Sequence, residues 1–270
     1  MRFAAALLAG ALCLAPAAPA LAQDSSARSI VQHLKPAEAA AFSKQVEREL
    51  AAKDARGAIV FRTGRPRSAL PKGISYTHGA FWVYRQINAA DGRKLNGYAV
   101  YNLYMGDGKA LPRNKSSLVQ DWPLDFMRGS AEDDVGVIIP SPEMQRRIIA
   151  LLDSPNYAAL HNPNYSLIAN PWAGKYQNCN GFMLDVIGSA AWSTTDTARI
   201  RANLRTHYKP TIVKAGPMMR LFGPMADSSL RTDDQSGPLR TATFESMAAF
   251  MGGNGLLKSS YVLKRQVAPA

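Results

Sequence analysis

The chain has 270 residues and a formal net charge of +12 at pH 7, from 32 Lys and Arg against 20 Asp and Glu. Hydrophobic residues make up 47% of the chain and charged residues 19%, which is the usage of a globular protein and excludes a disordered one. Only 2 Cys are present, too few for a disulfide scaffold.

The first residues are typical of a secretory signal peptide. One positive charge at Arg2 precedes an apolar run from Ala4 to Leu14, and the small residues of Ala20-Leu21-Ala22 end the segment. We place cleavage after Ala22, which predicts a periplasmic or secreted mature chain. No later apolar run is long enough to cross a bilayer, so we expect no integral membrane protein after cleavage. An uncleaved membrane anchor is the alternative.

Cleavage would change the charge and the thiol count. The mature chain keeps 31 basic and 20 acidic residues, a net charge of +11, and Cys179 as its one cysteine. A lone cysteine in an exported chain is free, paired with another chain or kept for its chemistry. The positive charge predicts an anionic partner such as a wall polymer or lipid phosphates. The sequence has neither a basic run nor an aromatic stacking motif, so we do not expect a nucleic-acid partner.

Hydrophobic periodicity predicts several strands followed by helices, which favours an α+β fold with an antiparallel sheet over a regular βαβ alternation. In chain order we expect a helix over 35–53, strands over 58–61, 74–85, 98–104 and 135–139, helices over 141–152, 179–191 and 195–207, a strand over 211–214 and a helix over 244–251. The expected segments are a signal peptide (1–22), an N-terminal helical segment (23–56), one α+β domain (57–252) and a C-terminal tail (253–270).

Cys179 is the candidate nucleophile because it begins a predicted helix, where free N–H groups and the helix dipole lower the pKa of a thiol. A reactive thiol also needs a base. The candidates are the four histidines, His33, His78, His161 and His207. His78 is the best of them, since it lies in mid-strand beside Gly79, where another group can approach closely. Asn102 on the following strand would orient the imidazole if the two strands pair.

Each of these residues also has a purely structural interpretation. Cys179 can be a small buried hydrophobe and His78 a satisfied sheet residue. A long segment rich in Pro and Asn leads to the thiol, and its aromatic residues can line a groove or hold the segment against the body. Those aromatic residues are Tyr165, Trp172 and Tyr176. No two His, Cys or acidic residues have the spacing of metal ligands, so we expect neither a metal nor a cofactor.

The blocks around these residues resemble one bacterial family. Tyr76-Thr77-His78-Gly79-Ala80-Phe81 is similar to the Y-[ST]-H-x-G-[FY] segment of the family named domain of unknown function 2145. Three further blocks, over 137–143, 161–171 and 176–180, resemble later segments of that family in the same order, so the resemblance covers about residues 58–251.

The layout of that family is similar to circularly permuted papain-like proteins, which include cell-wall cysteine peptidases and the lecithin retinol acyltransferase group. The resemblance implies Cys179 as nucleophile, His78 as base and Asn102 as the orienting residue, although many relatives carry Ser in place of Cys179 and His in place of Asn102. The Cys179 amide, with the Gln177 side chain, would stabilise an oxyanion. Residues expected to bind the substrate are Gln177, Asn178, His161, Tyr165, Trp172 and Tyr176.

Two functions are compatible with this pattern. The first is an exported thiol hydrolase or acyl-transferase that acts on a peptide or lipid amide, or an ester, of cell-envelope material, with His78 taking the proton of Cys179. The alternative is a non-catalytic envelope binding protein on a degenerate papain-like shell. Contact between the sulfur and an imidazole favours the enzyme. A sulfur buried away from any ring nitrogen favours the binding protein.

Overall fold

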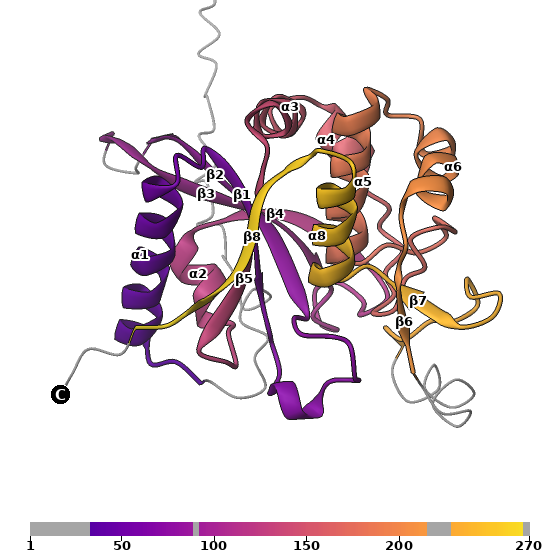
Figure 1. The fold of residues 1–270 in the computed structure, drawn as a ribbon. Coiled ribbons are helices and arrows are strands. Elements are labelled where there is room, and N and C mark those ends of the chain that lie inside the picture. Colours follow the sequence, from indigo (N-terminus) through magenta and orange to yellow (C-terminus); the bar gives the residue numbers. More distant parts are fainter. Residues whose placement is uncertain (1–32, 89–91, 215–227, 267–270) are drawn as a thin grey trace, which may run out of the picture.

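A six-stranded antiparallel sheet forms the centre of the molecule in a computed structural model that describes residues 33–88, 92–214 and 228–266 (Figure 1). The predicted signal peptide lies outside the described residues. The strand order is β4-β3-β2-β1-β5-β8. The strands are β1 (Gly57–Arg62), β2 (His78–Asn88), β3 (Lys94–Met105), β4 (Ser116–Asp121), β5 (Asp134–Pro140) and β8 (Leu257–Lys264).

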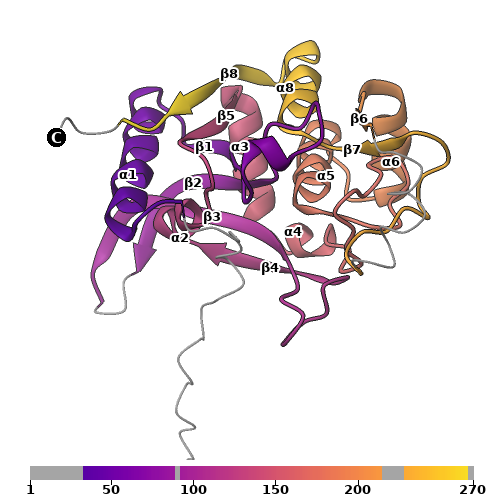
Figure 2. The same cartoon turned by 90° about the horizontal axis from the view of Figure 1, so that it is seen from below.

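Helices cover both faces of the sheet (Figures 1 and 2). One face carries α1 (Pro36–Ala52) and α2 (Pro123–Arg128). The other carries α3 (Pro142–Leu152), α5 (Cys179–Trp192) and α8 (Phe244–Gly253). The remaining elements are the 3₁₀ turn η1 (Arg67–Ala69), α4 (Asn156–Ala159), α6 (Thr197–His207) and a two-stranded ribbon of β6 (Thr211–Val213) and β7 (Leu239–Thr241).

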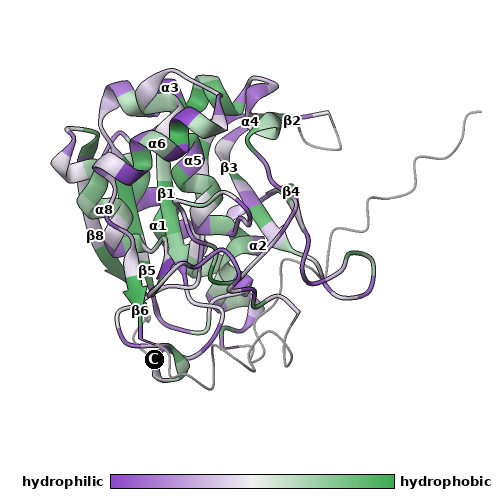
Figure 3. Cartoon of the chain, turned by 90° about the vertical axis from the view of Figure 1, so that its right-hand side faces the viewer, coloured by the Kyte–Doolittle hydropathy of each residue, from purple (hydrophilic) through white to green (hydrophobic). Residues whose placement is uncertain are grey.

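The central strands serve two hydrophobic cores because successive side chains point to opposite faces. On β2, Phe81 and Val83 enter the core beneath α5, whereas Ala80 and Trp82 enter the core beneath α1 and α2. All six residues of β1 are buried, as expected of a strand covered on both faces. In Figure 3 the strands β1 and β5 and helix α5 are largely hydrophobic, and hydrophilic residues show on α3 and α6.

Side-chain caps explain where the helices begin. The Asn178 side chain accepts a hydrogen bond from the Gly181 N–H at 2.8 Å and so caps α5. Asp196 caps α6 by accepting from Ala198 N–H at 2.9 Å. At the start of α3, Ser141 caps and Pro occupies the first turn.

The predicted fold class is confirmed, and each predicted helix and strand has its counterpart with small shifts at the ends. One shift matters: the strand expected to begin at residue 74 begins at His78, so Tyr76 precedes β2 and packs with Phe61 and Phe244 on the α5 side. Sequence reasoning missed β4, α2, α4, β7 and β8. The last of these lies in the expected C-terminal tail and pairs with β5 at the edge of the sheet. Within the described residues, no helix has the length and apolarity needed to cross a membrane.

The packing of α5 on β2 depends on the absence of a side chain at Gly79. A Cβ there would overlap the Met183 side chain and approach the Phe61 ring to 2.8 Å. We expect Gly79→Ala to lower the free energy of unfolding by about 1–3 kcal/mol, the usual cost of overpacking a core. Gly253→Ala, where nothing lies within 4 Å, is the control and should be neutral or slightly stabilising. Equal urea midpoints for the two variants would contradict this packing.

Candidate functional site

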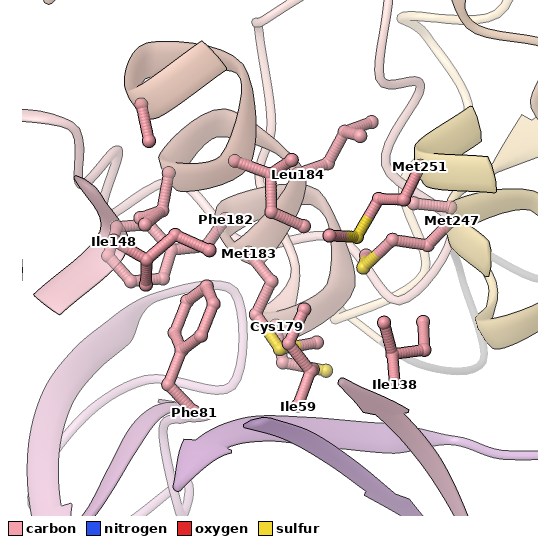
Figure 4. Packing of buried hydrophobic residues seen from close by; sticks show 14 of the residues in the cluster. Ile59, Phe81, Ile138, Ile148, Cys179, Phe182, Met183, Leu184, Met247 and Met251 are labelled. Carbon is pink, nitrogen blue, oxygen red and sulfur yellow. The ribbon is translucent and has the colours of Figure 1, made fainter. Parts of the chain in front are cut away.

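Cys179 is the first residue of α5 and lies inside the core between that helix and the sheet. Only 4% of the residue is exposed. Figure 4 shows it among Ile59, Ile138 and Met183. Its sulfur lies 3.7 Å from the carbonyl oxygen of Thr77, to which the thiol donates, and 3.7 Å from Asn180 Oδ1. The thiol is therefore hydrogen-bonded to the backbone just before β2.

Burial raises the pKa of the Cys179 thiol because it penalises the charged thiolate. The N–H groups of Gly79 and Asn180 and the positive charge of Arg62 act in the opposite direction on this pKa without overcoming burial. The helix-start effect expected from the sequence is present but outweighed, so the prediction of a lowered thiol pKa is corrected: the thiol is protonated at neutral pH.

His78 opens β2, and its half-buried ring sits on the face that carries α2. Its Nε2 lies 3.0 Å from Asn102 Oδ1. The ring stacks on Tyr104, with centroids 4.9 Å apart, and lies 5.6 Å from the Phe126 ring. The structure therefore brings His78 and Asn102 together on neighbouring strands, which is the geometry that the sequence predicted for this pair.

A chain of hydrogen bonds continues from Asn102 to a carboxylate. Asn102 Nδ2 donates to Asp121 Oδ2 at 3.0 Å, and the Tyr104 hydroxyl donates to the same oxygen at 2.6 Å. Because the Asn102 amide nitrogen donates to the carboxylate, the Asn102 amide oxygen must accept from the imidazole. This assigns the proton of neutral His78 to Nε2. Asp121 and Tyr104 were missed as site residues because nothing in their spacing marks them.

Burial and a neighbouring buried arginine hold His78 in its neutral form. Arg62 pairs with His78 across β1 and β2, donates to the Gly129 carbonyl and hydrogen-bonds to Tyr104. Burial, and then the positive charge of Arg62, lower the pKa of His78 to about 3, against a smaller opposing effect of the Asn102 bond. The imidazole is thus uncharged at neutral pH.

The thiol and the imidazole do not meet. His78 extends to the side of Ala80 and Trp82, whereas Cys179 belongs to the core of Phe81. In the part of the chain that the structure describes, no hydrogen bond joins the Cys179 sulfur to a histidine ring nitrogen. The predicted contact between nucleophile and base is therefore corrected. The physical reason is the alternation of the strand, which turns Gly79 and not His78 toward α5.

Gln177, the predicted oxyanion donor, uses its amide elsewhere. Its Nε2 donates to the Leu160 carbonyl at 3.0 Å and to Asp185 Oδ2 at 2.7 Å, and its Oε1 accepts from Asn162 N–H at 2.8 Å. Asp185 is itself buried against Arg201, which binds it through both guanidinium nitrogens. The Gln177 side chain therefore fastens the segment before Cys179 to α5, and no amide hydrogen remains for an oxyanion.

The other predicted substrate residues also hold their segment in place. Asn178 caps α5, and Tyr165 is buried in the core. His161 Nε2 lies 2.9 Å from the Ser116 hydroxyl. The Trp172 indole donates to the Tyr208 carbonyl at 3.3 Å, and the Tyr176 hydroxyl donates to Asp233 at 3.0 Å. The structural interpretation of these side chains is the one that the contacts support. No group of three or more His, Cys, Asp and Glu suited to a metal occurs in the described ranges.

The fold and the site define an α+β protein with an antiparallel sheet covered on both faces and a partly buried His–Asn–Asp hydrogen-bond chain that does not contact the thiol. A family model described as "uncharacterized protein conserved in bacteria (DUF2145)" matches residues 49–251, well over half of the chain, so the chain belongs to this family. No curated protein and no solved structure matches it. The family predicted from the sequence blocks is thereby confirmed, while the similarity to papain-like proteins stays a prediction.

The low pKa of His78 predicts a pH-dependent contribution to stability. The unfolded chain binds a proton at His78 below about pH 6.5, and the folded chain does so only near pH 3. The free energy of unfolding should therefore fall as the pH falls between these values, by up to about 1.4 kcal/mol per pH unit from this group. His78→Gln should lose that component, so wild type and variant should converge as the pH is lowered in urea titrations. Parallel curves over this window would contradict the assignment.

Proposed function

We propose that this chain is an exported, non-catalytic binding protein of the bacterial cell envelope. One observation carries the proposal: the Cys179 sulfur is buried and bonded to the Thr77 carbonyl, while the His78 imidazole is bonded to Asn102 on the side of α2. Export rests on the predicted signal peptide of residues 1–22.

Thiol catalysis needs a base, an ionisable thiol and a free oxyanion donor together, and the described side chains do not bring the three together. A nucleophile needs a base within about 3 Å, and no imidazole bonds to this sulfur. The thiol should ionise near neutral pH, but burial raises its pKa. An oxyanion needs donors that are not already used, and the Gln177 amide is bonded to Leu160 and Asp185.

The charge of the chain supports an anionic partner. The mature chain would carry a net charge of +11, and the described acidic groups pair with only part of the exposed cations. A protein with this excess attracts anionic polymers over a range of about 10 Å at moderate salt. An anionic polymer of the envelope is therefore the partner that we propose.

We expect the native Cys179 thiol to resist alkylation. Iodoacetamide labelling at pH 7 to 8 should be at least about tenfold slower than that of an exposed thiol, because the sulfur is buried and protonated. The protein unfolded in urea should label at the ordinary rate, and Cys179→Ala is the control for specificity. Half-labelling of the folded protein well below pH 8.5 would show an activated thiolate and favour the hydrolase.

The same proposal predicts that binding is independent of the thiol. Wild type and Cys179→Ala should sediment equally with isolated envelope material, and added salt should release both, because the attraction is between charges. Loss of a bond-breaking activity toward that material in Cys179→Ala, measured by release of soluble fragments, would contradict a non-catalytic role.

A further inference from the structure

Four cations converge on one short segment at the surface, residues 172–176. One of the cations belongs to the segment, and the other three come from other parts of the fold, up to 65 positions away in the chain. We name this surface the basic face. It consists of Lys175, Arg205, Arg231 and Arg240 with the rings of Trp172 and Tyr176.

One half of the basic face is built on Trp172. Arg240 of β7 lies over the indole at 5.2 Å, and Arg205 of α6 donates to the Trp172 carbonyl at 2.8 Å. The indole N–H is bonded inward to the Tyr208 carbonyl, which fixes the ring. Arg240 Nη1 also donates to the Pro238 carbonyl at 3.1 Å, so contacts on both guanidinium groups hold them in place.

The other half is built on Tyr176. Lys175 lies over its ring at 5.6 Å and Arg231 at 5.4 Å. Asp233 accepts from Lys175 at 2.8 Å and lies 3.6 Å from Arg231. The exposed Asp233 and the partly buried Asp234, which also interacts with Lys175, face four cations at the basic face, so the local charge stays positive.

We propose that the basic face is the binding site for a phosphate-bearing polymer, which deepens the proposed function and rests on it. Arginine presents a planar fork of donors that matches phosphate oxygens, and rings that orient it lower the entropy cost of binding. The cations lie along an extended segment and not around one point. Several weak contacts with successive phosphates of one chain can therefore act together.

An exposed apolar side chain adds contact area beside the cations. Ile212 on β6 lies opposite Arg240 on β7, so both side chains project from the same face of the ribbon, and Ile212 is 54% exposed. It can cover the carbon backbone of a polymer whose phosphates bind the arginines. An anionic lipid surface is the rival partner that the experiment separates.

The test uses poly(glycerol phosphate) as the probe and the double variant Arg231→Gln with Arg240→Gln. Binding, measured by fluorescence anisotropy of the labelled polymer, should weaken by about tenfold, and its salt dependence should become shallower by about one unit of slope for each lost contact. Arg146→Gln with Arg147→Gln removes the same charge from α3, where both arginines pair with Glu143, and should change affinity by less than about twofold. Arg231→Lys with Arg240→Lys keeps the charge and should give an intermediate affinity.

The outcomes separate the two proposals. If wild type binds the polymer and the basic-face variant binds equally well, or the α3 variant is weakened as much, the basic face is overturned and the binding function stands. If wild type does not bind the polymer, both the site and the anionic partner fail. If the basic-face variant loses binding to anionic phospholipid vesicles but not to the polymer, the polymer is overturned as partner. Matching melting temperatures of all variants exclude unfolding as the cause of a loss.

Discussion

Side-chain alternation along β2, in a sheet covered on both faces, decides what the candidate site can do. His78 and Gly79 are neighbours in the chain, yet the imidazole extends toward Phe126 of α2 and the position of Gly79 receives Met183 of α5. The sulfur of Cys179 approaches the same stretch of backbone from the α5 side. One residue of register therefore separates two groups that would have to touch for thiol chemistry.

The polar groups on the α2 side form a connected network of hydrogen bonds. Asp121 orients Asn102, Asn102 fixes the tautomer of His78, and burial together with the charge of Arg62 lowers the pKa of His78 and keeps the imidazole neutral. Each of these buried groups has a partner, as buried polar groups need. The network joins residues of β1, β2, β3 and β4 and so ties these four strands together.

Local signals in the sequence predicted much of the fold but only part of the candidate site. Apolar periodicity predicted α3, α6 and the central strands, and the capping residues Ser141 and Asp196 agree with it, because such signals act within a few residues. The pairing of His78 with Asn102 was also predictable, because adjacent strands pair. The burial of Cys179 and the role of Asp121 were not, since each depends on which distant element covers a given face. The edge strand β8 was missed because its sequence, LKSSYVLK, has no regular apolar–polar alternation, although its burial does alternate.

The protonation state of Cys179 tests the central claim most directly. The ultraviolet absorbance of the thiolate can be followed from pH 5 to 10 as the difference between wild type and Cys179→Ala, and repeated in a His78→Ala background. We predict that the thiolate band appears only above the ordinary thiol pKa and does not move when His78 is removed. A thiolate already present at neutral pH that disappears with His78 would show a thiolate–imidazolium pair and contradict the account.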